Sequence, residues 1–233
     1  MEFVEGETLD NLINRTGRFD IKLALEVTIQ VAAGLAAIHE KNLVHRDIKP
    51  TNIMVSLKEE RSVTAKIIDL GLAKTAMNES ASQAAISTPG VFAGTPEFAS
   101  PEQFAGVQVD IRSDLYSLGV TLWEMLIGRV PFRGSPSELM YQHQHTPLPI
   151  EQLQGVPQPV VVLLEVLLEK DPVRRFQTPA ELLKAMPMIT GAIGTRRRIT
   201  RQSFQKVRQA DSRIGTREPP ARLAPKNISV API

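Results

Sequence analysis

The sequence predicts an α+β fold that is mainly α-helical, with short β-hairpins. Apolar residues recur at helical spacing over residues 21–41 and again over 112–128. Two short segments of strand-forming residues, 53–55 and 65–68, lie on either side of a charged turn. Hydrophobic residues make up 42% of the 233 residues, which is enough for the core of one domain of ordinary size.

The first elements follow from local signals. Residues 1–6 have the pattern of an extended segment that enters a turn. Thr8 is placed to cap a short helix, which Gly17 stops. Asp20 is placed to cap the long helix over residues 21–41.

The middle of the chain alternates between loop and helix. Residues 71–100 are rich in Ala, Ser, Thr, Gly and Pro and show no stable period, which is typical of a functional loop. The helix over 112–128 follows. Ser135 or Ser137 is then placed to cap a helix that ends near His145.

The last predicted elements are two helices. Residues 146–159 are rich in proline and irregular, and a helix is expected over 159–170. A final helix begins at Thr178, because a proline at its first position suits a helix start. After Pro187 the sequence is polar and basic and shows no apolar face.

The balance of charged residues also changes close to Pro187. Residues 1–189 hold 17 Lys and Arg against 23 Asp and Glu, whereas residues 190–233 hold 10 against 2. We therefore predict one domain over 1–187 and a disordered basic linker over 188–233. Its arginines, Arg196 to Arg198 and Arg201, are also compatible with an anionic lipid or nucleic acid. The near absence of aromatic residues favours the linker, so we do not expect a nucleic-acid partner.

Composition excludes several classes of protein. The chain has no cysteine, which excludes disulfides and thiolate zinc sites. The longest apolar run, residues 160–168, is far shorter than the ~20 residues of a membrane helix, so no membrane span is predicted. The N-terminus shows no signal peptide. A cytoplasmic location is the simplest expectation.

One motif carries recognisable chemistry. The chain contains His45-Arg46-Asp47-Ile48-Lys49-Pro50-Thr51-Asn52 and, seventeen residues after Asn52, Asp69-Leu70-Gly71. The combination of a carboxylate, a lysine, an amide and a second carboxylate suits phosphoryl transfer from Mg²⁺-bound ATP.

A second block, Gly94-Thr95-Pro96-Glu97-Phe98-Ala99-Ser100-Pro101-Glu102, follows this motif. With both blocks, residues 1–187 resemble the C-terminal lobe of a protein Ser/Thr kinase of the bacterial signalling type. The resemblance implies a protein-kinase-like fold and a protein substrate with a Ser or Thr acceptor. The lysine at position 49 fits Ser/Thr kinases, whereas many tyrosine kinases have an arginine pattern there. Leu70 stands where the family usually has Phe.

The resemblance also implies roles for the first motif. Asp47 would be the catalytic base that orients the acceptor hydroxyl and takes its proton. Lys49 would neutralise charge on the γ-phosphate. Asn52 and Asp69 would hold Mg²⁺ through oxygen atoms.

For ATP, the family implies a hinge at the start of the chain. The backbone groups of Glu2 and Val4 would bond adenine, and Met54 would form the floor of the pocket. The rival interpretation is an ordinary strand and a core methionine.

Other residues would organise the loops. In the family, Thr95 bonds the catalytic loop, Glu102 pairs with an arginine that corresponds to Arg175, and Asp114 holds the catalytic-loop backbone. Arg46 would receive a phosphate on the activation loop. The possible acceptors are Thr75, Ser80, Ser82, Ser87 and Thr88.

Some expected kinase parts are missing from the sequence. It has no Gly-rich loop, no lysine like that of V-A-I-K and no helix glutamate to pair with that lysine. We therefore expect a fragment that needs a missing N-lobe or partner domain and is weak or inactive alone. The alternative is a catalytically silent binding or scaffolding module.

The pair His143 and His145 resembles a metal motif only superficially. Residues at i and i+2 do not share a helix face, so a surface polar patch is the prediction.

Overall fold

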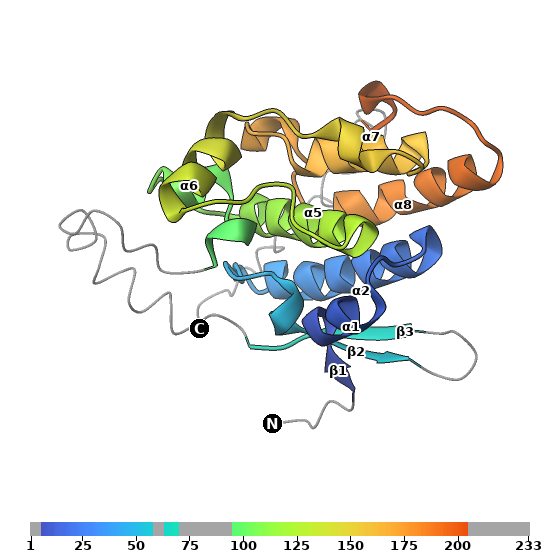
Figure 1. Ribbon diagram of the computed structural model, residues 1–233, viewed down its shortest axis with the longest axis horizontal. Helices are drawn as coiled ribbons and strands as arrows, with labels where there is room; N and C mark the ends of the chain where they lie inside the picture. Colours follow the sequence, from blue (N-terminus) through green and yellow to red (C-terminus); the bar gives the residue numbers. More distant parts are fainter. Residues whose placement is uncertain (1–5, 58–62, 70–94, 205–233) are drawn as a thin grey trace, which may run out of the picture.

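The computed structural model describes residues 6–57, 63–69 and 95–204. Its layers are helical, with a small sheet at one side (Figure 1). The helices are α1 (Leu9–Thr16), α2 (Ile21–His39), α4 (Pro101–Phe104), α5 (Ile111–Ile127), α6 (Pro136–His145), α7 (Gln158–Leu167) and α8 (Pro179–Gly194). The 3-10 turns are η1 (Pro50–Asn52), η2 (Pro96–Phe98), η3 (Ile150–Leu153) and η4 (Pro172–Arg174).

Several predicted helix ends are confirmed by their caps. The side chain of Thr8 accepts from Asn11 N, and that of Asp20 accepts from Leu23 N. Ser135, one of the two serines considered, caps α6. Gly128 ends α5 in the left-handed conformation, which glycine adopts without steric cost.

The core lies between four helices. α5 is buried along nearly its whole length and packs on α2 and α7, while α8 packs on α2 and α7 (Figure 1). Close approach of α5 and α7 requires Gly119, because a Cβ atom there would lie 2.8 Å from Leu167 Cβ. The long helix α2 is therefore the support on which the other elements are assembled.

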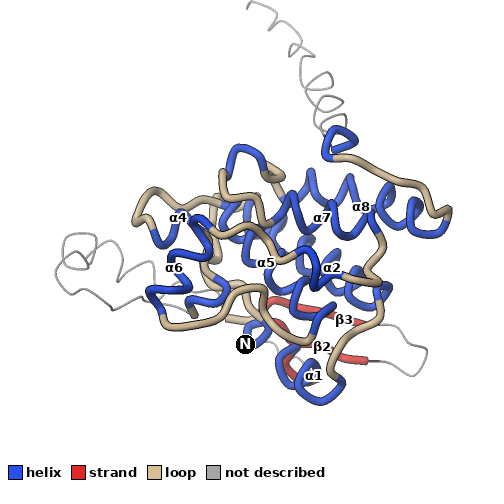
Figure 2. The backbone as a smooth tube through the Cα atoms, turned by 45° about the horizontal axis from the view of Figure 1, so that its top comes forward, coloured by secondary structure: helices blue, strands red, loops and turns tan. Residues whose placement is uncertain are grey.

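The sheet has three antiparallel strands in the order β1-β2-β3. β1 (Glu7–Thr8) pairs with β2 (Ile53–Leu57), and β2 pairs with β3 (Val63–Ile67), with Val55 opposite Ala65. Figure 2 shows the sheet beside α1 and α2. The hairpin was predicted from its two segments, whereas strand β1 was not.

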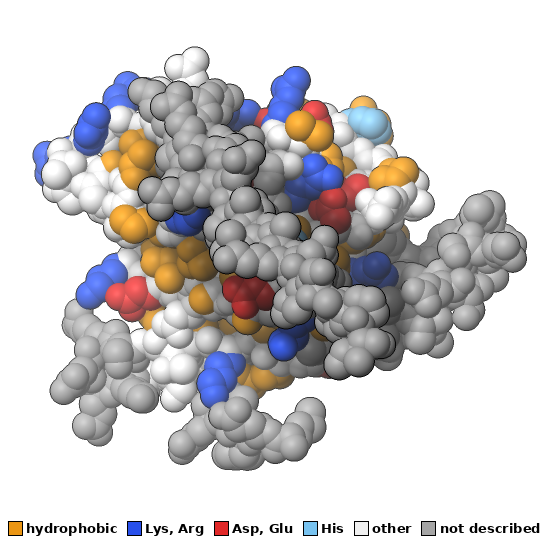
Figure 3. All heavy atoms as spheres, turned by 180° about the vertical axis from the view of Figure 1, so that it is seen from behind, with side chains coloured by type: hydrophobic (Ala, Val, Ile, Leu, Met, Phe, Trp, Pro, Cys, Tyr) orange, Lys and Arg blue, Asp and Glu red, His pale blue; other side chains and the backbone are white. Residues whose placement is uncertain are grey.

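Helix α2 is long and apolar enough, by length and composition alone, to cross a membrane. Its contacts with α5, α8 and β3 are those of a core helix, which passes the same test. On the rear face, hydrophobic side chains of the described residues gather between single acidic and basic side chains (Figure 3).

The prediction that no apolar face follows Pro187 was wrong. α8 continues through Pro187 to Gly194, and Ile189 and Ala192 are buried. These two residues extend the buried stripe of the preceding turns at helical spacing, so burial favours continuation of the helix despite the proline.

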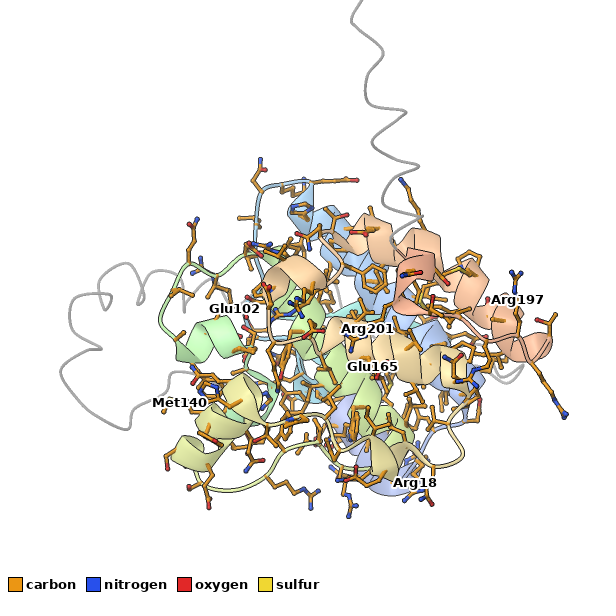
Figure 4. The ribbon with its side chains drawn as sticks, turned by 90° about the horizontal axis from the view of Figure 1, so that it is seen from above. Arg18, Glu102, Met140, Glu165, Arg197 and Arg201 are labelled. Atoms are coloured by element: carbon orange, nitrogen blue, oxygen red, sulfur yellow. The ribbon has the colours of Figure 1, made fainter. Side chains whose placement is uncertain are left out.

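The chain after α8 also packs on the helices. Ile199 exchanges two hydrogen bonds with the side chain of Gln158, and the ring of Phe204 lies edge-on to Phe176. Arg201 forms ion pairs with Glu165 and Glu169 on the α7 side, as Figure 4 shows for Glu165. The folded part therefore extends at least to Phe204, beyond the predicted boundary at residue 187.

The prediction of a surface patch at the two histidines was wrong for one of them. His143 is fully buried, and His145 is exposed. The i, i+2 spacing correctly predicted that the two side chains lie on different faces of α6. It did not show that the face with His143 packs inward.

Candidate active site

The loop between α2 and β2 brings three of the predicted residues together. The side-chain amide of Asn52 donates to the backbone oxygen of Asp47 at 2.8 Å and to Asp47 Oδ2 at 3.0 Å. The turn η1 makes this possible, because it folds residues 50–52 back on the loop. Asn52 uses its nitrogen in these bonds, so its amide oxygen suits a hard metal ion.

Lys49 joins Asp47 to a distant segment. Lys49 Nζ lies 3.2 Å from Asp47 Oδ2 and donates to Thr95 Oγ1 at 2.7 Å. The side chains of Lys49 and Asp47 are 18% and 15% exposed. Their charges are therefore mostly surrounded by protein, which strengthens their attraction, but solvent still reaches both groups. The arrangement places a cation beside the carboxylate and fixes the start of η2 next to both.

Asp114 fixes the backbone of the loop that contains His45 and Arg46. Its two carboxylate oxygens accept from the backbone N–H groups of His45 and Arg46, at 2.8 and 2.7 Å. Arg46 has a positive φ of 66°, a conformation that costs energy for a residue with a side chain. Burial raises the pKa of Asp114 to about 7, although both amide bonds and Arg46 favour the anion. The buried Asp114 carboxylate therefore holds in place a part of the loop whose backbone conformation is strained.

Asp69 follows β3 and also has a positive φ, 58°. The neighbouring Ile68 N donates to Asn52 O at 2.9 Å, which ties the two predicted metal ligands through the backbone. The Asp69 side chain is exposed and borders a hollow of about 470 Å³ that α2 and β3 line. Among the described residues, no hydrogen bond joins its carboxylate to Asp47, Lys49 or Asn52.

The donor set fits Mg²⁺. A neutral amide oxygen at Asn52 and a solvent-accessible carboxylate at Asp69 are hard ligands, and Mg²⁺ keeps several waters and needs only one or two protein groups. The described residues contain no cluster of three or more His, Asp or Glu side chains able to hold a metal.

Glu102 and Arg175 form a two-pronged ion pair. Arg175 donates from its two terminal nitrogens to Glu102 Oε1 and Oε2, at 2.7 and 2.9 Å. Burial acts to raise the pKa of Glu102, but the bonds and charge of Arg175, with a bond from Ser113, lower it overall. The remaining guanidinium hydrogens bond backbone oxygens, so this buried pair is well satisfied.

The structure adds two site residues that the sequence analysis missed. Gln103 Nε2 donates to the backbone oxygen of Arg46 at 3.1 Å, and Ser117 Oγ donates to Phe98 O at 2.7 Å. The capping box of Ser100 and Gln103 is a readable signal, although it predicts only a helix start.

Some predicted residues lie outside the described part of the chain. These are Glu2, Val4, Leu70, Gly71 and the five possible phosphate acceptors. Met54 is described: it is half-buried in β2, opposite Thr8 and Lys66. Its contact with adenine stays a prediction.

The fold is that of a protein kinase domain. The model of the protein kinase domain family matches residues 1–187, and the chain belongs to this family. Its relatives place it among the bacterial Ser/Thr kinases.

One relative is serine/threonine-protein kinase pkn2 of Myxococcus xanthus, 42% identical over 83% of this chain and 23% of its own. Serine/threonine-protein kinases PknA of Corynebacterium glutamicum is 38% identical over 81% of this chain and 38% of its own. Serine/threonine-protein kinase PknB of Mycobacterium leprae is 35% identical over 78% of this chain and 28% of its own. The chain therefore spans between 23% and 38% of these relatives' length.

Proposed function

We propose that this chain is cytoplasmic and carries the catalytic half of a kinase that transfers the γ-phosphate of ATP to Ser or Thr hydroxyls of a protein substrate. One observation carries the proposal: the Asp47 carboxylate is held by both Asn52 and Lys49, and the same lysine bonds Thr95. This arrangement orients a base, a cation and the segment beside them before any substrate binds.

In the reaction, the acceptor oxygen forms a bond to the γ-phosphorus as the bond between that phosphorus and the oxygen of the β-phosphate breaks. Asp47 orients the acceptor hydroxyl and takes its proton, and Lys49 stabilises the charge on the transferred group. Bound Mg²⁺ would neutralise the phosphate oxygens, and Asn52 and Asp69 would hold it. Asp114 contributes by keeping the loop in its strained conformation.

The environment of Arg46 supports regulation of the kinase by a bound anion. Its Nε is buried and has no hydrogen-bond partner among the described residues, which is costly for a cationic donor. A phosphate on the activation segment would satisfy it. The candidate acceptors are Thr75, Ser80, Ser82, Ser87 and Thr88.

The sequence lacks a Gly-rich loop and the lysine that pairs the α- and β-phosphates. We therefore propose that the chain alone is weakly active or inactive and works with an N-lobe. The same observation favours the second candidate function, a catalytically silent scaffold.

The test compares the 233-residue chain with a form that carries the N-lobe of the Myxococcus relative. Each is incubated with labelled ATP, Mg²⁺ and a generic Ser/Thr protein substrate. We expect Mg²⁺-dependent transfer only in the second form, with a loss of orders of magnitude in Asp47→Asn and Asp69→Ala. Asp171→Asn is the matched control, because Asp171 is an exposed cap that Asn can replace.

Three results would decide against parts of the proposal. Robust turnover by the chain alone, abolished by Asp47→Asn, would contradict weak activity. Near-normal rates in Asp69→Ala would contradict its metal role. ATP binding without transfer in the N-lobe form would favour the scaffold.

A further inference from the structure

His143 lies in an aromatic cage. Its ring stacks on Phe104 with centroids 5.6 Å apart and meets the rings of Tyr116 and Phe132 edge-on at 5.7 and 5.1 Å. The three aromatic residues come from α4, α5 and the segment after α5, while His143 itself belongs to α6. One imidazole therefore joins three separate parts of the chain.

The ring nitrogens of His143 are in different environments. Nδ1 lies 2.8 Å from the hydroxyl oxygen of Tyr116. Nε2 is buried and makes no hydrogen bond among the described residues. In the tautomer with its hydrogen on Nε2, the ring accepts a hydrogen bond from the Tyr116 hydroxyl through Nδ1.

The surroundings keep the ring neutral. Burial lowers the pKa of His143 to about 3, and the positive charge of Lys170 adds to the effect. Lys170 Nζ lies 4.5 Å from the Phe132 ring centroid and donates to Gln142 O at 3.1 Å, so it contacts both the cage and α6.

The cage adjoins the segment that leaves the candidate active site. η2 begins directly after Thr95, whose hydroxyl receives the hydrogen bond from Lys49. η2 packs against both α5 and α6, and Ser117 of α5 holds Phe98 O. The two helices that the His143–Tyr116 contact joins therefore both pack on the segment that follows the lysine contact.

We propose that His143 is a positioning residue for phosphoryl transfer: by bonding Tyr116 it joins α6 to α5, and it thereby fixes η2, which both helices contact and which follows Thr95, the partner of Lys49. The proposal rests on the proposed kinase function. It assigns an effect on binding of the protein substrate, because η2 adjoins the Thr95–Lys49 contact at the proposed transfer site. ATP would be little affected, since its predicted ligands lie elsewhere.

The decisive variant is His143→Phe, which keeps a ring in the cage and removes both nitrogens. Tyr116→Phe removes the hydroxyl partner, and His145→Gln is the control on the exposed face of the same helix. Amide hydrogen exchange of the full chain is measured in η2, where Phe98 N bonds Thr95 O, and in α2. Nitrogen NMR of His143 reports which ring nitrogen carries the proton.

We expect exchange in η2 to increase by about tenfold or more in His143→Phe and Tyr116→Phe, with α2 unchanged. We also expect a proton on Nε2 of the wild-type ring. In the N-lobe form, KM for the protein substrate should rise several-fold, while KM for ATP stays within about twofold.

Unchanged η2 exchange in His143→Phe would overturn the proposal, as would an equal increase throughout α2, which marks an ordinary core residue. A proton on Nδ1 would overturn the assigned hydrogen bonds. The exchange and NMR measurements need no turnover, so they decide the role of His143 in η2 even if the N-lobe form proves inactive.

Discussion

Arg175 and Glu102, 73 residues apart in the chain, bond through two parallel N–H···O contacts of 2.7 and 2.9 Å while the arginine is fully buried. The pair joins α4 to the segment after η4. The guanidinium also lies over the ring of Tyr116, with its central carbon 4.8 Å from the ring centroid. The ion pair is thus continuous with the cage around His143.

Replacing Arg175 by Met should lower the free energy of unfolding by about 3–5 kcal/mol, because Glu102 would remain as a buried charge without its partner. The double variant Arg175→Met, Glu102→Leu should recover part of the loss. Urea unfolding of both variants and of the wild type measures this. A loss under about 1 kcal/mol in the single variant would show that the pair contributes little.

Replacing Gly119 by Ala should destabilise the fold by about 1–3 kcal/mol, because the new methyl would lie 2.8 Å from Leu167 Cβ and 3.0 Å from Leu168 Cδ2. Gly191→Ala is the matched control. It lies in α8 with nothing within 4 Å of the added atom, and alanine is the better helix former there. Thermal unfolding of both variants should move in opposite directions, and equal shifts would contradict the packing argument.

Stability should fall on acidification because of His143. The pKa of this ring is about 3 in the folded state, against about 6.5 in an unfolded chain. Between these values the unfolded chain binds a proton that the folded chain does not. The contribution of His143 is therefore fully present above about pH 6.5 and is lost by up to about 1.4 kcal/mol per pH unit below it.

The measurement is the difference in unfolding free energy between the wild type and His143→Phe across pH 4–7. Taking the difference matters because burial raises the pKa of Asp114 and Glu124 to about 7, which has the opposite sign. If the difference does not change with pH, the buried neutral state of His143 is wrong.

Replacing Phe204 by Ala should loosen the segment after α8. The ring packs on Phe176, and burial of a phenylalanine contributes as much as about 3–5 kcal/mol in a core. Arg201→Ala should cost no more than about 1 kcal/mol, because its side chain is half exposed. Hydrogen exchange at Ile199, whose amide bonds Gln158, reports both, and equal effects would contradict the assignment of the anchor to Phe204.

Much of the fold was predictable from local signals. The caps at Thr8, Asp20 and Gly128 and the apolar period of α5 are properties of neighbouring residues, so the sequence alone predicts where these helices lie. The continuation of α8 was missed because its evidence lies in tertiary burial, which overrides a proline and a polar surrounding sequence.

The short motif with Asp47, Lys49 and Asn52 predicted the class of chemistry, because side chains within one short motif must lie near one another. The role of Asp69 was predicted from the family resemblance. Only the tertiary structure decided which distant groups complete the site: Thr95 bonds Lys49, and Asp114 bonds the backbone of His45 and Arg46. A sequence records residue types and local spacing. Contacts between residues 46 to 69 positions apart depend on how the helices pack, which local spacing does not contain.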